Sequence, residues 1–137
     1  MGFTRGELAA LRGTEVDDLI GPGCRLLFVG INPGLWTAAT GAHFARPGNR
    51  FYPALAVAGI TPHRIDASSG MSDADREMLL HRGIGITNIV ARATANAAEL
   101  TREELLAGGE MLRTKVARIG PAVVAILGIT AYRTAFR

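Results

Sequence analysis

The sequence contains very little cysteine and lysine: Cys24 is its only cysteine, and Lys115 is the single lysine beside fourteen arginines. With one cysteine no internal disulfide can form, and no group of Cys and His residues has the spacing of a zinc site. No stretch reaches the roughly 20 apolar residues of a membrane span, and none has the pattern of a secretory signal. We therefore expect a soluble, cytoplasmic protein without membrane contact, disulfide or metal.

Carboxylates are missing from a long part of the chain. None occurs between Asp18 and Asp66. The same span contains four arginines: Arg25, Arg46, Arg50 and Arg64. A polyanion could approach it without charge repulsion, although the net charge of +3 is small. The alternative interpretation is that the span contains a buried strand and a Gly/Pro-rich loop, which have few carboxylates in any protein.

Three apolar runs between turn residues predict buried strands, at residues 26–29, 84–86 and 122–127. Capping residues predict helices that begin near Thr4, Ser72 and Thr101, and two more helices are expected at 51–58 and after residue 128. Strands that alternate with helices indicate an α/β fold. We predict one domain over residues 1–137, a three-layer α/β/α sandwich around a mainly parallel sheet.

Two details of this pattern matter for the site. Residues 30–50 contain six glycines and prolines without periodicity, which predicts one long structured loop after the first strand. Ligands of parallel sheets bind beyond the carboxyl ends of the strands, so this loop is the first candidate for a functional site. Gly108 and Gly109 are expected to weaken the helix after Thr101 in its middle.

The long loop contains two motifs, GINPG at residues 30–34 and GAHFARPGNRF at 41–51. They resemble the signature of the mismatch-specific uracil/thymine DNA glycosylases, a branch of the uracil-DNA glycosylase superfamily. The similarity continues through GITNIV at 85–90, Arg92, Thr94 and AILG at 125–128, and it covers nearly the whole chain from Ile20 onward. A dinucleotide-binding loop is the main rival, but GINPG lacks the GxGxxG glycines, and Pro33 removes an N–H that would bind phosphate.

The resemblance assigns catalytic roles within these motifs. It implies that Asn32 positions the water that attacks the sugar, and that the backbone N–H groups of Ile31 and Phe44 stabilise the leaving base. It also implies that His43 assists the water or stabilises the anion. From the residues alone, a turn residue before proline is the favoured interpretation of Asn32, and His43 is as often a surface histidine.

The resemblance also assigns binding roles. Phe44 is the expected stacking platform for an extracted pyrimidine, Gly34 leaves room for a 5-methyl group, and Asn88 is expected to pair with the pyrimidine edge. Asn49 and Arg50 either support the loop or contact DNA phosphates. The simpler alternatives are a core aromatic for Phe44 and an end-of-strand turn residue for Asn88.

The expected function is therefore base-excision repair without a cofactor. The resemblance implies a monomeric hydrolase that acts on double-stranded DNA and releases uracil or thymine mispaired with guanine. It would leave an intact abasic site, because Lys115 lies far along the chain from the motifs and no other lysine could form a Schiff base. In the cell such an enzyme would associate with the nucleoid.

The resemblance also predicts what should follow residue 136. Family members continue into another strand, an NPSGL-type wedge loop and a closing helix, which this sequence lacks, so we expect it to be a fragment of a longer protein. Without that strand, a sheet edge and apolar surface should be exposed and favour self-association. The alternative function is a DNA- or lesion-binding module that keeps the pocket but does not cut.

Overall fold

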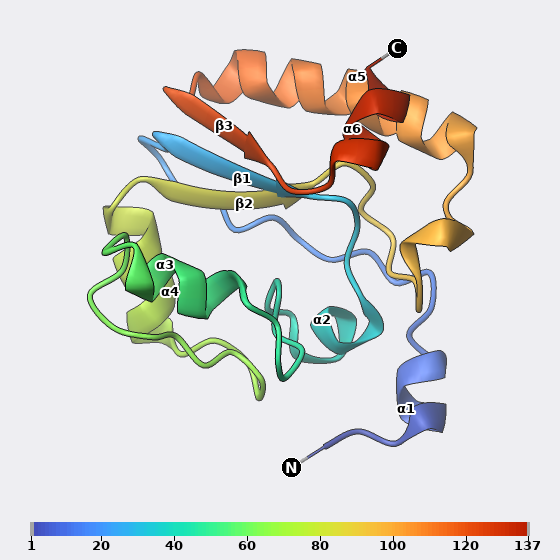
Figure 1. The fold of residues 1–137 in the computed structure, drawn as a ribbon, viewed down its shortest axis with the longest axis horizontal. Helices are drawn as coiled ribbons and strands as arrows, with labels where there is room; N and C mark the ends of the chain where they lie inside the picture. The colour runs from blue at the N-terminus through green and yellow to red at the C-terminus, as the bar shows by residue number, and fades with distance from the viewer. Residues whose placement is uncertain (1, 137) are drawn as a thin grey trace.

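A parallel three-stranded sheet forms the centre of the computed structural model, which describes residues 2–136 (Figure 1). The strands are β1 (Leu26–Gly30), β2 (Ile84–Asn88) and β3 (Val123–Ile126), and their order in the sheet is β2-β1-β3. All of them run in the same direction, with Leu26 opposite both Ile84 and Val123. Their carboxyl ends therefore meet at one edge of the sheet.

Helices cover both faces of the sheet, as Figure 1 shows. One face carries α5 (Arg102–Ile119) and α6 (Ile129–Ala135). The other carries α2 (Leu35–Thr40), α3 (Phe51–Val57) and α4 (Asp73–His81), and the short α1 (Arg5–Ala9) and η1 (Ala97–Glu99) lie at the periphery. This confirms the predicted three-layer α/β arrangement. No helix within residues 2–136 is long and apolar enough to cross a membrane.

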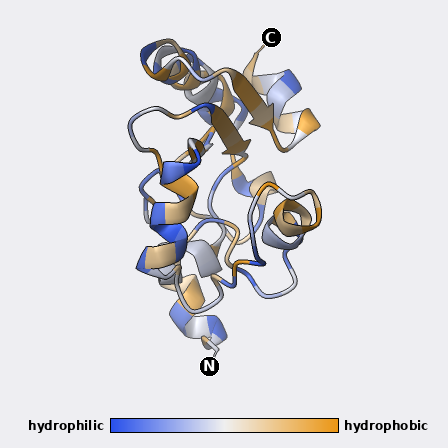
Figure 2. Ribbon diagram, turned by 90° about the vertical axis from the view of Figure 1, so that its left-hand side faces the viewer, coloured by the Kyte–Doolittle hydropathy of each residue, from blue (hydrophilic) through white to orange (hydrophobic). Residues whose placement is uncertain are grey.

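Apolar side chains along β1 point alternately to the two faces of the sheet, which explains why both faces must be covered. Leu27 and Val29 point to the face of α5 and α6 and are fully buried, whereas Phe28 packs on the opposite face. Apolar groups on both sides of a strand are removed from water only between two layers of helices. Figure 2 shows strands that are hydrophobic along their length and helices in which hydrophobic and hydrophilic residues alternate.

The predicted loop at residues 30–50 is wrong in one respect, because α2 (Leu35–Thr40) lies inside it. The helix has no side-chain cap at Gly34 and includes weakly helix-forming threonines, so few local features mark these residues as helical. Tertiary contact holds it in place: the indole N–H of Trp36 donates to the Ser68 carbonyl at 2.9 Å. The helix ends at Gly41, whose φ of 72° suits glycine.

The helix after Thr101 is also stronger than predicted, since α5 runs without interruption through Gly108 and Gly109. Both glycines are buried at close contacts. A Cβ on Gly108 would collide with the Ile89 carbonyl oxygen, and one on Gly109 with the Ala135 carbonyl oxygen. The two glycines therefore let α5 lie directly against the segment after β2 and against α6, and this packing offsets their low helix propensity.

Candidate active site

A cavity of about 570 Å³ opens at the carboxyl ends of β1 and β2, the edge predicted from the sequence. Seven of the eight residues expected to form the site line it, namely Ile31, Asn32, Gly34, His43, Phe44, Asn49 and Asn88. Arg50 does not line it and is exposed at the start of α3. Tertiary structure thus brings Asn88 next to His43, which lies 45 positions earlier in the chain.

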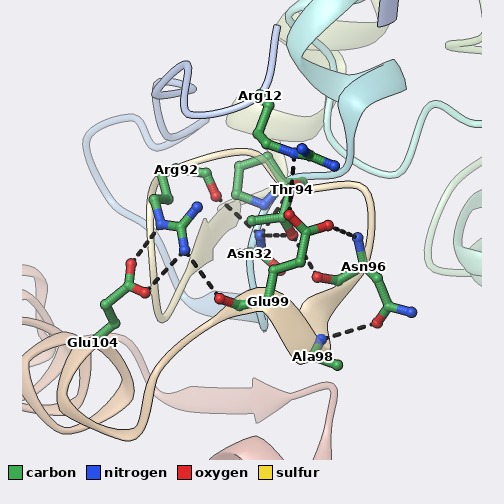
Figure 3. Close-up of polar contacts among 9 residues, drawn as sticks. Arg12, Asn32, Arg92, Thr94, Asn96, Ala98, Glu99 and Glu104 are labelled. Carbon is green, nitrogen blue, oxygen red and sulfur yellow. Dashed lines mark hydrogen bonds and ion pairs between the residues drawn. The ribbon is translucent and has the colours of Figure 1, made fainter. Parts of the chain in front are cut away.

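The side-chain nitrogen of Asn32 is held by several acceptors at once (Figure 3). It donates to the Arg92 carbonyl at 2.9 Å and to Thr94 Oγ1 at 2.8 Å, with a longer contact of 3.2 Å to the Pro33 carbonyl. Carbonyl oxygens can only accept, and the Thr94 hydroxyl already donates to the Asn96 carbonyl at 2.9 Å. The amide therefore has one favourable orientation, and its oxygen remains as an acceptor on the cavity wall.

The segment that supplies these acceptors is fixed to the start of α5, as Figure 3 also shows. Arg92 forms a two-pronged ion pair with Glu104, at 2.5 and 3.0 Å, and donates to the Glu99 carbonyl at 3.2 Å. Hydrogen bonding to Arg92 lowers the pKa of Glu104 to about 2. Glu104 also belongs to the capping box with Thr101 that starts α5, so helix and loop share one anchor.

Phe44 has a strained backbone and a partly exposed ring on the cavity wall. Its φ of 56° is the only positive value among non-glycine residues in the described chain. Strain of this kind is commonly found where a side chain must be held in a particular position. The ring leans on Phe51, with centroids 4.2 Å apart, and within residues 2–136 no protein group accepts from the Phe44 backbone N–H. The ring face and the backbone N–H are thus available to a ligand, and the stacking and donor roles of Phe44 stay predictions.

His43 is buried, not a surface residue, and both of its ring nitrogens have polar neighbours. Nε2 lies 2.7 Å from the Asp17 carbonyl oxygen, and Nδ1 lies 3.3 Å from Nδ2 of Asn88. Burial lowers the pKa of His43, while the hydrogen bond to Asp17 and the charge of Asp18 oppose the shift. The net effect favours the neutral form of the ring.

The two residues that follow the loop motif have separate positions. Asn49 accepts a hydrogen bond from the Phe51 N–H at 2.8 Å, which stabilises the turn into α3, and it also lines the cavity. Arg50 is solvent-exposed beside it. Within the described residues no hydrogen bond or ion pair from the Arg50 side chain to protein is formed, so its guanidinium faces solvent.

The family model of the uracil DNA glycosylase superfamily matches residues 18–137. The chain belongs to this superfamily. Membership indicates a DNA glycosylase, a hydrolase that removes a base from DNA, and therefore DNA as its partner. The matched span includes every residue expected to form the site and all three strands of the sheet.

The cavity of this DNA glycosylase is nearly uncharged. Arg46 is the one lining residue in the described chain with a charged side chain, and no lining residue is a carboxylate. Within residues 2–136 no group of three or more potential metal ligands is present. The polar groups that could act on a bound base are thus amides, hydroxyls, one neutral imidazole and backbone N–H groups.

Sequence reasoning missed Thr94 and Arg46 as members of the site. Thr94 lies 62 positions after Asn32, and a threonine in a loop has no pattern that marks it as a partner of that amide. Arg46 lies inside the loop motif and within the carboxylate-free span, so its position on the cavity was within reach of the sequence.

Proposed function

We propose that this chain is a monofunctional DNA glycosylase that releases uracil or thymine mispaired with guanine. Asn32 positions the attacking water, Phe44 stacks on the extracted base, and Asn88 pairs with its edge. The mismatch-specific branch of the superfamily is the one whose motifs the chain resembles.

The observation that carries the proposal is the orientation of Asn32. Because its nitrogen donates to Arg92 and Thr94, its oxygen is the part of the amide that can accept a hydrogen bond from a water molecule in the cavity. An amide does not take up a proton at neutral pH, so Asn32 orients the water without acting as a base.

The charge that develops in the reaction then falls on the leaving base. Its oxygens would be stabilised by fixed donors such as the backbone N–H groups of Ile31 and Phe44. No carboxylate lines the cavity to stabilise positive charge on the sugar, which supports slow turnover compared with a glycosylase that has one.

The shape and charge of the site support the remaining parts of the proposal. A Cβ on Gly34 would have no atom within 4 Å, so the cavity wall is open there and can accommodate a 5-methyl group. Lys115 belongs to α5, and its Nζ donates to Asp18 at 2.5 Å and to Thr87 at 3.0 Å. It does not line the cavity, which favours hydrolysis by water over a Schiff base.

The test is release of uracil from a labelled duplex with one G·U pair, followed by alkali to cut the abasic site. We expect release by the parent chain and a loss of roughly a hundredfold or more in Asn32→Ala. Thr114→Ala, on the exposed surface of α5, is the control and should behave like the parent. Thermal unfolding of each variant checks that it is folded.

Two outcomes would count against the proposal. Equal release by the parent and Asn32→Ala would remove Asn32 from the reaction. Binding to the G·U duplex without release from duplex or single-stranded DNA would favour a non-catalytic lesion-binding module.

A further inference from the structure

The strongest unassigned feature is a chain of hydrogen bonds that ends at Asn88. The Asp17 carbonyl lies 2.7 Å from His43 Nε2, and His43 Nδ1 lies 3.3 Å from Asn88 Nδ2. His43 is only 5% exposed, and the Tyr52 hydroxyl donates to its backbone carbonyl at 2.6 Å. The imidazole thus contacts Asp17 on one side and Asn88, the residue expected to pair with the base, on the other.

The Asp17 carbonyl determines which group donates in each of these hydrogen bonds. A carbonyl oxygen can only accept, so Nε2 of His43 must carry the hydrogen. In a neutral imidazole Nδ1 is then an acceptor, and Asn88 must turn its nitrogen toward it. The Asn88 oxygen consequently lies on the other side of the amide.

That oxygen and the Phe44 ring both lie close to Gly30. A Cβ on Gly30 would be 2.5 Å from Asn88 Oδ1 and 3.3 Å from Cζ of Phe44. Because Gly30 has no side chain, both groups can approach the backbone at the end of β1. Within residues 2–136 no protein group donates to this oxygen, so it can accept from a ligand.

We propose that His43 is a positioning residue, which fixes the Asn88 amide so that its oxygen accepts the N3–H of a bound pyrimidine. This inference rests on the proposed function. His43 acts here through Asn88, whose amide it orients.

The orientation of the Asn88 amide matters because uracil and cytosine have opposite hydrogen-bond donor and acceptor patterns at N3 and at the group on C4. Uracil and thymine carry a hydrogen on N3 beside the O4 acceptor, which pairs with the oxygen and the second amide hydrogen of Asn88 as fixed. Cytosine has an unprotonated N3 beside an amino group, which would pair with the same amide turned over. The His43 ring thereby sets a preference for uracil and thymine over cytosine.

The ring remains neutral because of its surroundings. Burial lowers the pKa of His43, and Arg76 acts in the same direction. The Asp17 hydrogen bond and the charge of Asp18 favour protonation but act against the larger effect of burial. A neutral ring is required, since a protonated Nδ1 would repel the Asn88 nitrogen.

The activity test compares uracil and cytosine, each placed opposite thymine so that neither forms a Watson–Crick pair. In His43→Phe, which keeps a buried ring but removes the acceptor, we expect uracil release to fall roughly tenfold while cytosine release does not fall. Structural damage alone would lower both rates. In an Asn88→Ala background, His43→Phe should have no further effect on the ratio of the two rates.

A second measurement needs neither activity nor a variant. Long-range ¹H–¹⁵N spectra of the parent protein report the tautomer of each imidazole, and we expect a neutral His43 with hydrogen on Nε2. A hydrogen on Nδ1, or a charged ring at neutral pH, overturns the inference. Absence of uracil release by the parent would instead overturn the proposed function, and uracil release with an unchanged ratio in His43→Phe would overturn this inference alone.

Discussion

Asn32 and Asn88 are uncharged amides whose two ends differ chemically, and in both cases backbone carbonyls decide which end faces the cavity. For Asn32 the Arg92 carbonyl takes the nitrogen directly. For Asn88 the Asp17 carbonyl acts through the ring of His43. A carbonyl oxygen cannot change from acceptor to donor, so the orientation of Asn32 is insensitive to moderate changes of pH, whereas that of Asn88 also requires a neutral His43 ring.

Thr94 is the side-chain acceptor for the Asn32 nitrogen, beside the backbone acceptor at Arg92. Thr94→Val keeps the volume of the side chain but removes the oxygen that accepts from Asn32 at 2.8 Å. We expect base release to fall about tenfold, with DNA binding within roughly twofold of the parent, because the water is positioned less well. Single-turnover rates and a DNA titration measure the two quantities.

Thr114→Val, on the exposed side of α5, is the matched control for Thr94→Val. If both substitutions lower the rate equally, the hydroxyl of Thr94 has no particular role in the site.

At the scale of elements, the segment after β2 is held between two partners. Gly34 pairs with Thr94 in an isolated bridge, and Arg92 joins the segment to the first turn of α5. The Asn32 amide on the β1 loop is therefore supported by a helix that begins 70 positions later in the chain. Ion pairs that bridge elements in this way restrict the loop as well as stabilise the fold.

Glu104→Gln tests this anchor through its pH dependence. Because the pKa of Glu104 is about 2 in the folded chain and 4.5 ordinarily, its stabilising effect is complete above about pH 4.5 and is lost as the pH falls toward 2. The variant should have a lower free energy of unfolding at neutral pH and lose less of it on acidification. Urea unfolding at several pH values measures this.

Glu103→Gln removes a neighbouring exposed carboxylate from the same turn and serves as the control. The same pH profile in both variants would show that the Arg92 ion pair adds nothing specific.

Gly108→Ala tests the close packing of α5 on the segment after β2. The added methyl group would collide with the backbone carbonyl of Ile89, and we expect a destabilisation of about 1–3 kcal/mol despite the better helix propensity of alanine. The control is Gly6→Ala in α1, where no atom lies within 4 Å and stability should be unchanged or slightly higher. Denaturant unfolding distinguishes the two, and equal effects would contradict the packing argument.

At the scale of the whole molecule, the two edges of the sheet differ. Leu19 covers β2 by pairing with Ile86, whereas β3 pairs only with β1 within residues 2–136. Val123 is 55% exposed on this open edge, and Ile129 of α6 is 64% exposed nearby in the chain. An open edge with apolar side chains favours pairing with another chain.

We therefore expect the chain to associate at high concentration and Val123→Lys to weaken that association, because charge on an edge strand opposes pairing. Val57→Lys, at a position 92% exposed on α3, is the control and should not change it. Sedimentation velocity over a range of concentrations is the measurement. A monomer at every concentration, or equal effects of the two substitutions, would contradict the expectation.

Local patterns in the sequence were enough to predict the class of fold and seven of the residues that line the cavity. The apolar runs at β1 and β3 and the capping boxes at Thr4 and Thr101 are local signals, since they depend on neighbouring residues only. The loop motif likewise placed Asn32 and Phe44 together because they belong to one segment after a buried strand. Superfamily membership was readable for the same reason.

How those residues are oriented depends on contacts between segments far apart in the chain. The partners of Asn32 are 60 and 62 positions away, and His43 reaches Asp17 and Asn88 across 26 and 45 positions. Hydrogen bonds over such separations leave no periodicity in a sequence, because each depends on how the β1 loop, the segment after β2 and α5 pack together. The identity of the groups was therefore encoded locally, and the direction in which each amide faces the cavity was set by the fold.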